Sequence, residues 1–182
     1  MAEYTLESPH FEAFGRIISG SALVETGIKV TLSAIMHSHS HYVHVLTAPY
    51  TANDLYNVAK SLAKVHFSED ENNRDLLIEL IGKYKSYTRL RNFIAHSFWV
   101  KGTRLGSIRP AYMSVREGRA EGRGFSDEER DYTILELQDA ANGLLALYEE
   151  FKGFLKSSGL ALSMEENIAD DNAATEPSEG TN

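Results

Sequence analysis

The sequence contains no cysteine, and this absence excludes two classes of chemistry. Without thiols the chain can form no disulfide framework and can offer no thiolate as nucleophile or metal ligand. Long hydrophobic runs are also missing, because Arg16, Glu25 and Lys29 interrupt the longest apolar stretch. We therefore expect no membrane-spanning segment and no membrane partner. The first residues lack the basic and apolar regions of a secretory signal, so we expect a cytoplasmic protein.

Basic residues are absent from residues 165–182, which carry six acids: Glu165, Glu166, Asp170, Asp171, Glu176 and Glu179. A segment this acidic, small and polar buries too little apolar surface to fold. We therefore expect a helical domain over residues 1–162 and a disordered acidic tail over residues 163–182. The formal net charge of −8 would be −2 without those six acids, so the overall charge is a weak argument against a nucleic-acid partner.

Basic residues are instead concentrated between residues 101 and 123. Six bases stand there against Glu117 and Glu121, a local surplus of +4: Lys101, Arg104, Arg109, Arg116, Arg119 and Arg123. A local surplus of this kind favours an anionic partner.

Apolar periodicity predicts four helices, over about residues 11–36, 51–65, 74–99 and 133–156. In the second helix, Leu55, Val58, Leu62 and Val65 form the expected buried face, and Thr51 or Asn53 is the expected cap.

Two further signals mark helix ends. Gly102 follows the third helix as a stop signal, and Thr133 and Glu136 have the spacing of a capping box at the start of the fourth. Glycines break any helical pattern over residues 105–125, where residues 108–115 suit a short ribbon. We therefore predict an all-α fold, a four-helix up-down bundle with a small basic loop or β-hairpin insertion before the last helix.

Small residues recur at heptad spacing along the first helix: Ala13, Gly20, Gly27 and Ala34. Each glycine inside a helix costs about 1 kcal/mol relative to alanine, so close packing of another helix is the expected compensation. That helix belongs either to the same fold or to a second copy of the chain, and the sequence does not distinguish the two.

Four histidines alternate near the end of the first helix: His37, His39, His41 and His44. No carboxylate or cysteine lies within this run, whereas a metal site needs a defined set of ligands. We therefore expect no metal site here but a polar, partly exposed helix end. Metal binding by these histidines is the alternative.

The most informative segment is Arg91-Asn92-Phe93-Ile94-Ala95-His96 at the end of the third helix. At 100° per residue, an apolar stripe lies within about 60° of Tyr84: Leu77, Leu80, Ile81, Tyr87, Ala95 and Phe98. Arg91 falls about 20° from the centre of this stripe, where a guanidinium needs a partner or a ligand. Asn92 and His96 are one helical turn apart beside it.

An arginine and asparagine followed by a histidine near a helix end, within a small helical protein, resemble the HEPN superfamily. The resemblance covers the helical part loosely and Arg91, Asn92 and His96 specifically. Members of that family are often metal-independent endoribonucleases, frequently toxins or phage-defence effectors. They typically act as homodimers whose two motifs face each other across a shared cleft, and some have an antitoxin or regulatory protein as partner. The resemblance implies Arg91 and His96 as catalytic residues, Asn92 as a supporting residue, and no cofactor.

The implied reaction is cleavage of single-stranded RNA by its own 2′-hydroxyl. An imidazole such as His96 suits proton transfer near neutral pH, and the guanidinium of Arg91 matches phosphate oxygens. Lys101, Arg104 and Arg109 would bind the RNA backbone.

Trp99 would stack a base, as would Tyr84 or Tyr87, although the two tyrosines fit the core better. The alternative is that Arg91 and His96 have structural roles only. The chain would then be a catalytically inactive, HEPN-like helical module that binds a protein or RNA partner.

Overall fold

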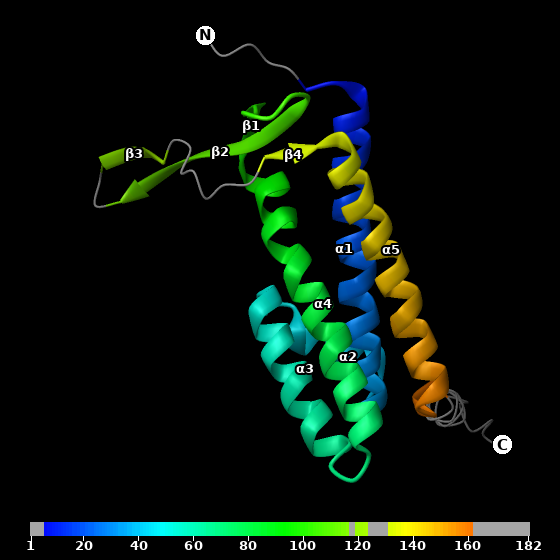
Figure 1. The fold of residues 1–182 in the computed structure, drawn as a ribbon. Helices are drawn as coiled ribbons and strands as arrows, with labels where there is room; N and C mark the ends of the chain where they lie inside the picture. The colour runs from blue at the N-terminus through cyan, green and yellow to red at the C-terminus, as the bar shows by residue number, and fades with distance from the viewer. Residues whose placement is uncertain (1–5, 117–118, 124–130, 162–182) are drawn as a thin grey trace, which may run out of the picture. The chain divides into compact units, whose positions relative to one another are not determined.

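The structure is a computed structural model that describes residues 6–116, 119–123 and 131–161. Figure 1 shows its helices and its small antiparallel sheet. The helices are α1 (Ser8–Ile35), α2 (Ser40–Thr47), α3 (Ala52–His66), α4 (Glu71–His96) and α5 (Ile134–Ser157), and the strands are β1 (Phe98–Lys101), β2 (Ser107–Arg116), β3 (Arg119–Arg123) and β4 (Tyr132–Thr133). The predicted all-α bundle with a hairpin insertion before the last helix is confirmed. Within the described ranges, no helix combines the length and apolarity that crossing a membrane requires. The predicted acidic tail lies outside the described residues.

The chain groups into two compact units, and α1, α4 and α5 each contribute to both. The first unit contains the chain up to Leu23 together with Ser86–Ala146. The second contains Val24–Lys85 and the chain from Leu147 onward. The predicted catalytic and RNA-binding residues all belong to the first unit.

The sheet of the first unit is organised around β2. Strand β1 pairs antiparallel with β2 in a register from Phe98 opposite Ala111 to Lys101 opposite Ile108. Strands β3 and β4 also pair antiparallel with β2. The ribbon predicted over residues 108–115 is therefore the centre of β2. On the helical side, this unit buries apolar residues from α1, α4 and α5: Ala13, Phe14, Ile17, Leu90, Leu137, Ala141 and Leu144.

Helix α4 ends three residues earlier than its periodicity predicted. It stops at His96, and Phe98 and Trp99 belong to β1. Trp99 is 4% exposed and its ring lies 4.8 Å from that of Phe14, centroid to centroid. Burial of this large ring favours the strand over a further helical turn. Gly102 is therefore not a helix stop but lies in the turn between β1 and β2.

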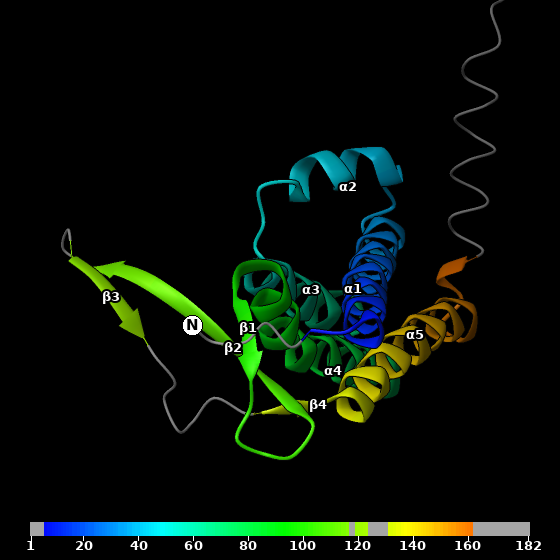
Figure 2. The ribbon, with the colours of Figure 1, turned by 90° about the horizontal axis from the view of Figure 1, so that it is seen from above.

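In the second unit, the histidine run contains a helix that the sequence did not predict as separate. His37 adopts a left-handed backbone (φ 48°) just after α1, and Ser40–Thr47 forms α2. The ring of His39 caps α2 by accepting a hydrogen bond from the backbone N–H of His41, 3.2 Å away. Figure 2 looks roughly along α1, and α2 lies across the view.

Helix α3 begins as predicted but buries a different face. Thr51 caps it with a complete capping box, in which Asp54 is the reciprocal partner. The buried side chains are Leu55, Ala59 and Ala63. The predicted face of Leu55, Val58, Leu62 and Val65 is wrong beyond its first residue, since Val65 is 75% exposed. Alanine side chains are small, so this face of the helix packs closely against its neighbours. The predicted face was chosen from the larger apolar side chains only.

The small residues of α1 pack within the chain. In the first unit, a Cβ at Gly20 would lie 3.0 Å from the Cβ of Leu144 on α5. In the second unit, a Cβ at Gly27 would lie 3.4 Å from the Cβ of Phe151 on the same helix. Ala13 and Ala34 are buried as well. This series of small residues therefore explains close packing of α1 against α5 and gives no support to a dimer contact.

Candidate functional site

Arg91, Asn92 and His96 occupy the last two turns of α4. The helix closes with a hydrogen bond from the Ser97 N–H to the Phe93 carbonyl, 3.0 Å long, after which the chain becomes extended. Asn92 and His96 are exposed and Arg91 is half-buried. All three side chains are therefore reachable from solvent.

The position of Arg91 on the helix had suggested a buried apolar seam. In the structure, Arg91 does not lie in such a seam. Leu77, Leu80, Ile81 and Tyr84 are buried as predicted, but the next fully buried residue of α4 is Leu90. Leu90 projects about 100° from Arg91 around the helix axis, so the buried face of α4 does not include Arg91 here. The guanidinium instead donates from Nη1 to the Oδ1 of Asn92, 3.2 Å away.

The three side chains leave the helix in different directions. Asn92 and His96 are one turn apart and about 40° from each other around the axis. Arg91 and His96 are about 140° apart and about 7.5 Å apart along the axis. Arg89, which belongs to no sequence motif, lies within about 20° of the His96 direction two turns earlier. The His96 face of α4 is therefore shared with Asn92 and Arg89.

The turn between β1 and β2 is built around Asp131, which is only 6% exposed. Its Oδ2 accepts hydrogen bonds from the N–H and hydroxyl of Thr103, the N–H of Arg104 and the hydroxyl of Ser107, at 2.5–3.0 Å. Burial alone would raise the pKa of Asp131, but these hydrogen bonds outweigh burial and lower it from 3.8 to about 2. This carboxylate could not be recognised from the sequence, because its partners lie more than twenty residues away.

Arg104, predicted to bind RNA, is already paired within the fold. Its Nη2 lies 2.6 Å from Oε2 of Glu136, and the same nitrogen donates to the backbone carbonyl of Asp131. Glu136 also completes the predicted capping box of α5, because Thr133 N–H donates to it at 2.8 Å. The hydrogen bonds from Arg104 and Thr133 lower the pKa of Glu136 from 4.5 to about 2. Arg104 thus links the β1–β2 turn to the start of α5.

Trp99, the residue predicted to stack an RNA base, is a core residue. Besides Phe14, it contacts Tyr132, with ring centroids 5.9 Å apart. A base needs an exposed ring face, and a side chain that is 4% exposed offers none. Its neighbour Phe98 is 71% exposed. Tyr84 is likewise core and donates its hydroxyl to Glu25 at 2.5 Å.

Lys101 and Arg109 flank the same turn on paired strands. Lys101 ends β1 and is exposed, whereas Arg109 lies in β2 and is half-buried. Arg116, Arg119 and Arg123 follow on β2 and β3, with Arg116 opposite Arg119 in the register. The bases of residues 101–123 therefore lie on the paired strands β1, β2 and β3 and on the turn between β1 and β2.

The histidine run shows ring contacts but no group of metal ligands. His39 and His41 stack with centroids 4.7 Å apart, and His37 approaches His66 of α3 at 6.3 Å. Among the side chains that the structure describes, no three histidines or carboxylates converge on one point.

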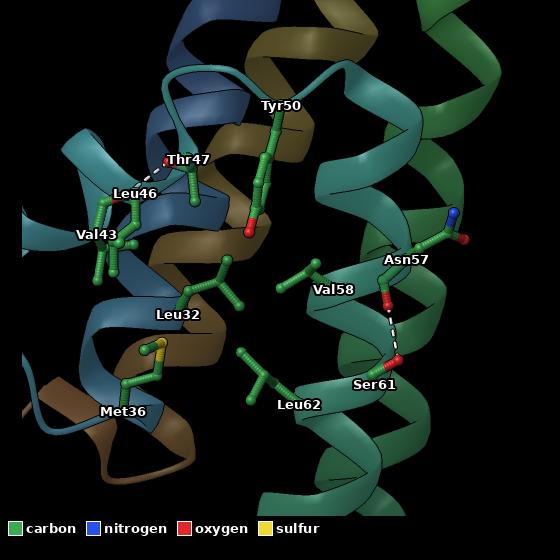
Figure 3. A pocket seen from close by; sticks show the side chains of 10 residues that line it. All are labelled: Leu32, Met36, Val43, Leu46, Thr47, Tyr50, Asn57, Val58, Ser61 and Leu62. Atoms are coloured by element: carbon green, nitrogen blue, oxygen red, sulfur yellow. Dashed lines mark hydrogen bonds between the residues drawn. The ribbon is translucent and has the colours of Figure 1, made fainter.

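The second unit contains an apolar pocket of about 470 Å³ between α1, α2 and α3. Figure 3 shows Leu32, Val58 and Leu62 pointing toward one another across it. Beside it, α2 exposes Tyr42, Val45 and Leu46 at 58–73% of their surfaces. Apolar surface of this kind, rimmed by polar residues, is typical of interaction sites.

Comparison of the chain with protein-family models, curated proteins and solved structures finds no match. The resemblance to the HEPN superfamily therefore rests on Arg91, Asn92 and His96 and on the helical fold that carries them. Function has to be argued from these residues and their surroundings.

Proposed function

We propose that this protein is a metal-independent endoribonuclease of the HEPN type, which cleaves single-stranded RNA. The observation that carries the proposal is the exposed end of α4, where Arg91, Asn92 and His96 directly precede three paired strands, β1 to β3, whose sequence is rich in bases. A cation and a titratable ring beside a basic surface are the groups that RNA cleavage requires.

In the proposed reaction, the 2′-hydroxyl of a ribose attacks the adjacent phosphorus while the bond to the 5′-oxygen of the next nucleotide breaks. The products are a 2′,3′-cyclic phosphate and a free 5′-hydroxyl. His96, in the last turn of α4, accepts the proton of the 2′-hydroxyl and passes it to the departing 5′-oxygen. Arg91 stabilises the negative charge on the phosphorane oxygens. No step needs a metal or a cofactor.

Asn92 supports the other two residues in this proposal. Its Oδ1 holds the Arg91 guanidinium at 3.2 Å, and its position one turn before His96 lets it contact the same phosphate. Arg91 and His96 diverge by about 140° around α4, so a phosphate between them must lie at the helix end rather than on its side.

Lys101 and Arg109 bind the RNA backbone in this proposal from opposite faces of the sheet, since the register pairs Lys101 with Ile108 and Arg109 with Val100. Arg104 contributes less to RNA binding in this proposal, because a contact with RNA would break its ion pair with Glu136. By the family resemblance, the working unit is a homodimer with two facing motifs, the biological role is that of a toxin or phage-defence effector, and an antitoxin or regulatory protein controls it.

Incubation of the purified full chain with single-stranded RNA in excess chelator tests the proposal. Cleavage should proceed in chelator, and the fragments should carry 2′,3′-cyclic phosphate and 5′-hydroxyl ends. Arg91→Lys should be slower, because an ammonium lacks the two-pronged fork that fits phosphate. Intact RNA, or fragments with 3′-hydroxyl ends, would refute this mechanism.

A second candidate function is a helical interaction module without catalysis, and the apolar pocket between α1, α2 and α3 favours it. Its natural occupant would be a partner protein that presents apolar side chains. Leu46→Asp should then abolish recovery of a stoichiometric partner from the native cells, while Val65→Asp, exposed on α3 but outside the pocket, should not. A chain that is always recovered alone would contradict this function.

A further inference from the structure

A second pocket, of about 440 Å³, lies entirely within the first unit. Helix α4 contributes Tyr87, Arg89 and Phe93, β4 contributes Tyr132 and α5 contributes Glu136. The volume is within the range of small-molecule sites in proteins, roughly 300–1,000 Å³. Three aromatic rings, a cation and a carboxylate thus line one cavity.

The aromatic walls are held in place by their neighbours. The ring of Tyr132 meets Trp99 edge-on at 5.9 Å. The hydroxyl of Tyr87 lies directly against Gly143 of α5, where a Cβ would be 2.2 Å from that oxygen. Glycine at this position therefore makes room for the tyrosine. Both rings are half-buried and keep part of their surface open.

The charged groups add polarity at the same cavity. The guanidinium carbon of Arg89 lies 5.3 Å from the centroid of the Phe93 ring, which is a cation–π distance. Glu136 lines the cavity from α5, with its carboxylate held by Arg104 and Thr133. A ligand suited to this cavity has a flat aromatic body and a nearby negative charge.

The pocket borders the His96 side of α4, although Leu90 and Tyr87, which also line it, project about 120° and 180° from the His96 direction. Phe93 precedes His96 by three residues and Arg89 precedes it by seven, so all three project from neighbouring directions of the helix. A chain bound with its phosphate at His96 would bring a neighbouring residue of the ligand to the cavity.

We propose that this pocket is a nucleobase-binding subsite, which takes one unpaired base of the single-stranded nucleic acid while Arg89 contacts the phosphate beside it. The inference rests on the proposed function for its ligand class. Unpaired bases stack on aromatic side chains whatever their identity, and the arginine neutralises the adjoining phosphate. The subsite explains how this chain binds bases, since Trp99 is buried.

Binding of a short single-stranded oligodeoxynucleotide to the full chain tests the subsite separately from catalysis, because DNA lacks the 2′-hydroxyl nucleophile. Phe93→Leu keeps an apolar side chain of similar size but removes the ring. Fluorescence anisotropy should show affinity reduced about tenfold in this variant. Phe98→Leu, an exposed aromatic outside the pocket, is the matched control and should bind as the parent does. Loss of affinity in Phe98→Leu alone would assign stacking to β1 and overturn the proposal.

An abasic version of the same oligonucleotide gives a second measurement. It should bind the parent about tenfold more weakly than the complete strand, and Phe93→Leu should bind both strands equally. Arg89→Ala should weaken both strands, whereas Arg74→Ala, the same charge change at the start of α4, should not. Equal binding of abasic and complete strands by the parent would overturn the subsite.

The two proposals fail separately in these experiments. Base-dependent binding through Phe93, with RNA left intact in the cleavage assay, would keep the subsite and remove the nuclease. Cleavage that Phe93→Leu leaves unchanged in both kcat and KM would keep the nuclease and remove the subsite.

Discussion

Asp131 gathers four hydrogen-bond donors on one carboxylate oxygen, and Gly102 lies against that cluster. A Cβ at Gly102 would be 2.2 Å from Oγ of Ser107 and 2.7 Å from Oδ2 of Asp131. Neither atom can move away without giving up hydrogen bonds. A single methyl group at this position is therefore expected to disturb the turn that carries Lys101 and Arg104.

Gly102→Ala should lower the free energy of unfolding by about 2 kcal/mol, the range of overpacked sites. Urea unfolding followed by circular dichroism measures it. Gly15→Ala is the control, since a Cβ at Gly15 meets nothing within 4 Å and alanine favours its helix. Equal effects of the two substitutions would contradict the packing described here.

The charge on Asp131 makes stability depend on pH. Because the folded state lowers the pKa from 3.8 to about 2, the carboxylate stabilises the fold above pH 4 and loses that effect as pH falls toward 2. Asp131→Asn should cost about 2 kcal/mol at neutral pH. The difference between parent and variant should shrink between pH 4 and pH 2, measured by urea unfolding at several pH values. A difference that stays constant across this range would show that the charge is not responsible.

At the scale of elements, Arg104 and Lys101 are adjacent bases with different expected roles. Arg104→Ala should lower the free energy of unfolding, because Glu136 loses its ion pair. Lys101→Ala should leave stability unchanged, weaken RNA binding and reduce the slope of log affinity against log salt by about 0.7. Thermal unfolding and salt-dependent anisotropy measure these effects. The reverse pattern would place the RNA contact at Arg104.

The sequence predicted the helices well where periodicity and caps agree. Thr51, one of the two expected caps, begins α3, and Thr133 begins α5 with the capping box that its spacing indicated. The end of α4 was missed, because Phe98 and Trp99 fit a helical stripe as well as they fit a strand. Contact of Trp99 with Phe14, 85 positions earlier, favours the strand, and no local pattern contains that contact.

The candidate site was only partly visible in the sequence for the same reason. Arg91, Asn92 and His96 are close in sequence, and their shared helix end could be read directly. The pocket beside them joins Phe93 to Tyr132 and Glu136, which come from elements some forty residues later. The sequence alone therefore could not predict which residues line this pocket.

For the whole molecule, α1 and α5 share a close contact in each unit, through Gly20 in the first and Gly27 in the second. Gly27→Leu should thus lower the free energy of unfolding by about 2 kcal/mol and leave the mass measured by light scattering unchanged. Gly153→Leu on α5 is the control, since a Cβ there meets nothing within 4 Å. If Gly27→Leu instead changed the oligomeric state and kept the stability, Gly27 would belong to a dimer interface and not to an intramolecular contact.

The most direct test of the ribonuclease proposal compares two histidine substitutions in one assay. The single-turnover rate of RNA cleavage in chelator is measured for the parent, for His96→Ala and for His44→Ala, an exposed histidine on α2. Loss of the proton relay should slow His96→Ala by about 100-fold or more, while His44→Ala should cleave at the parental rate. Equal rates for His96→Ala and the parent would contradict the central claim.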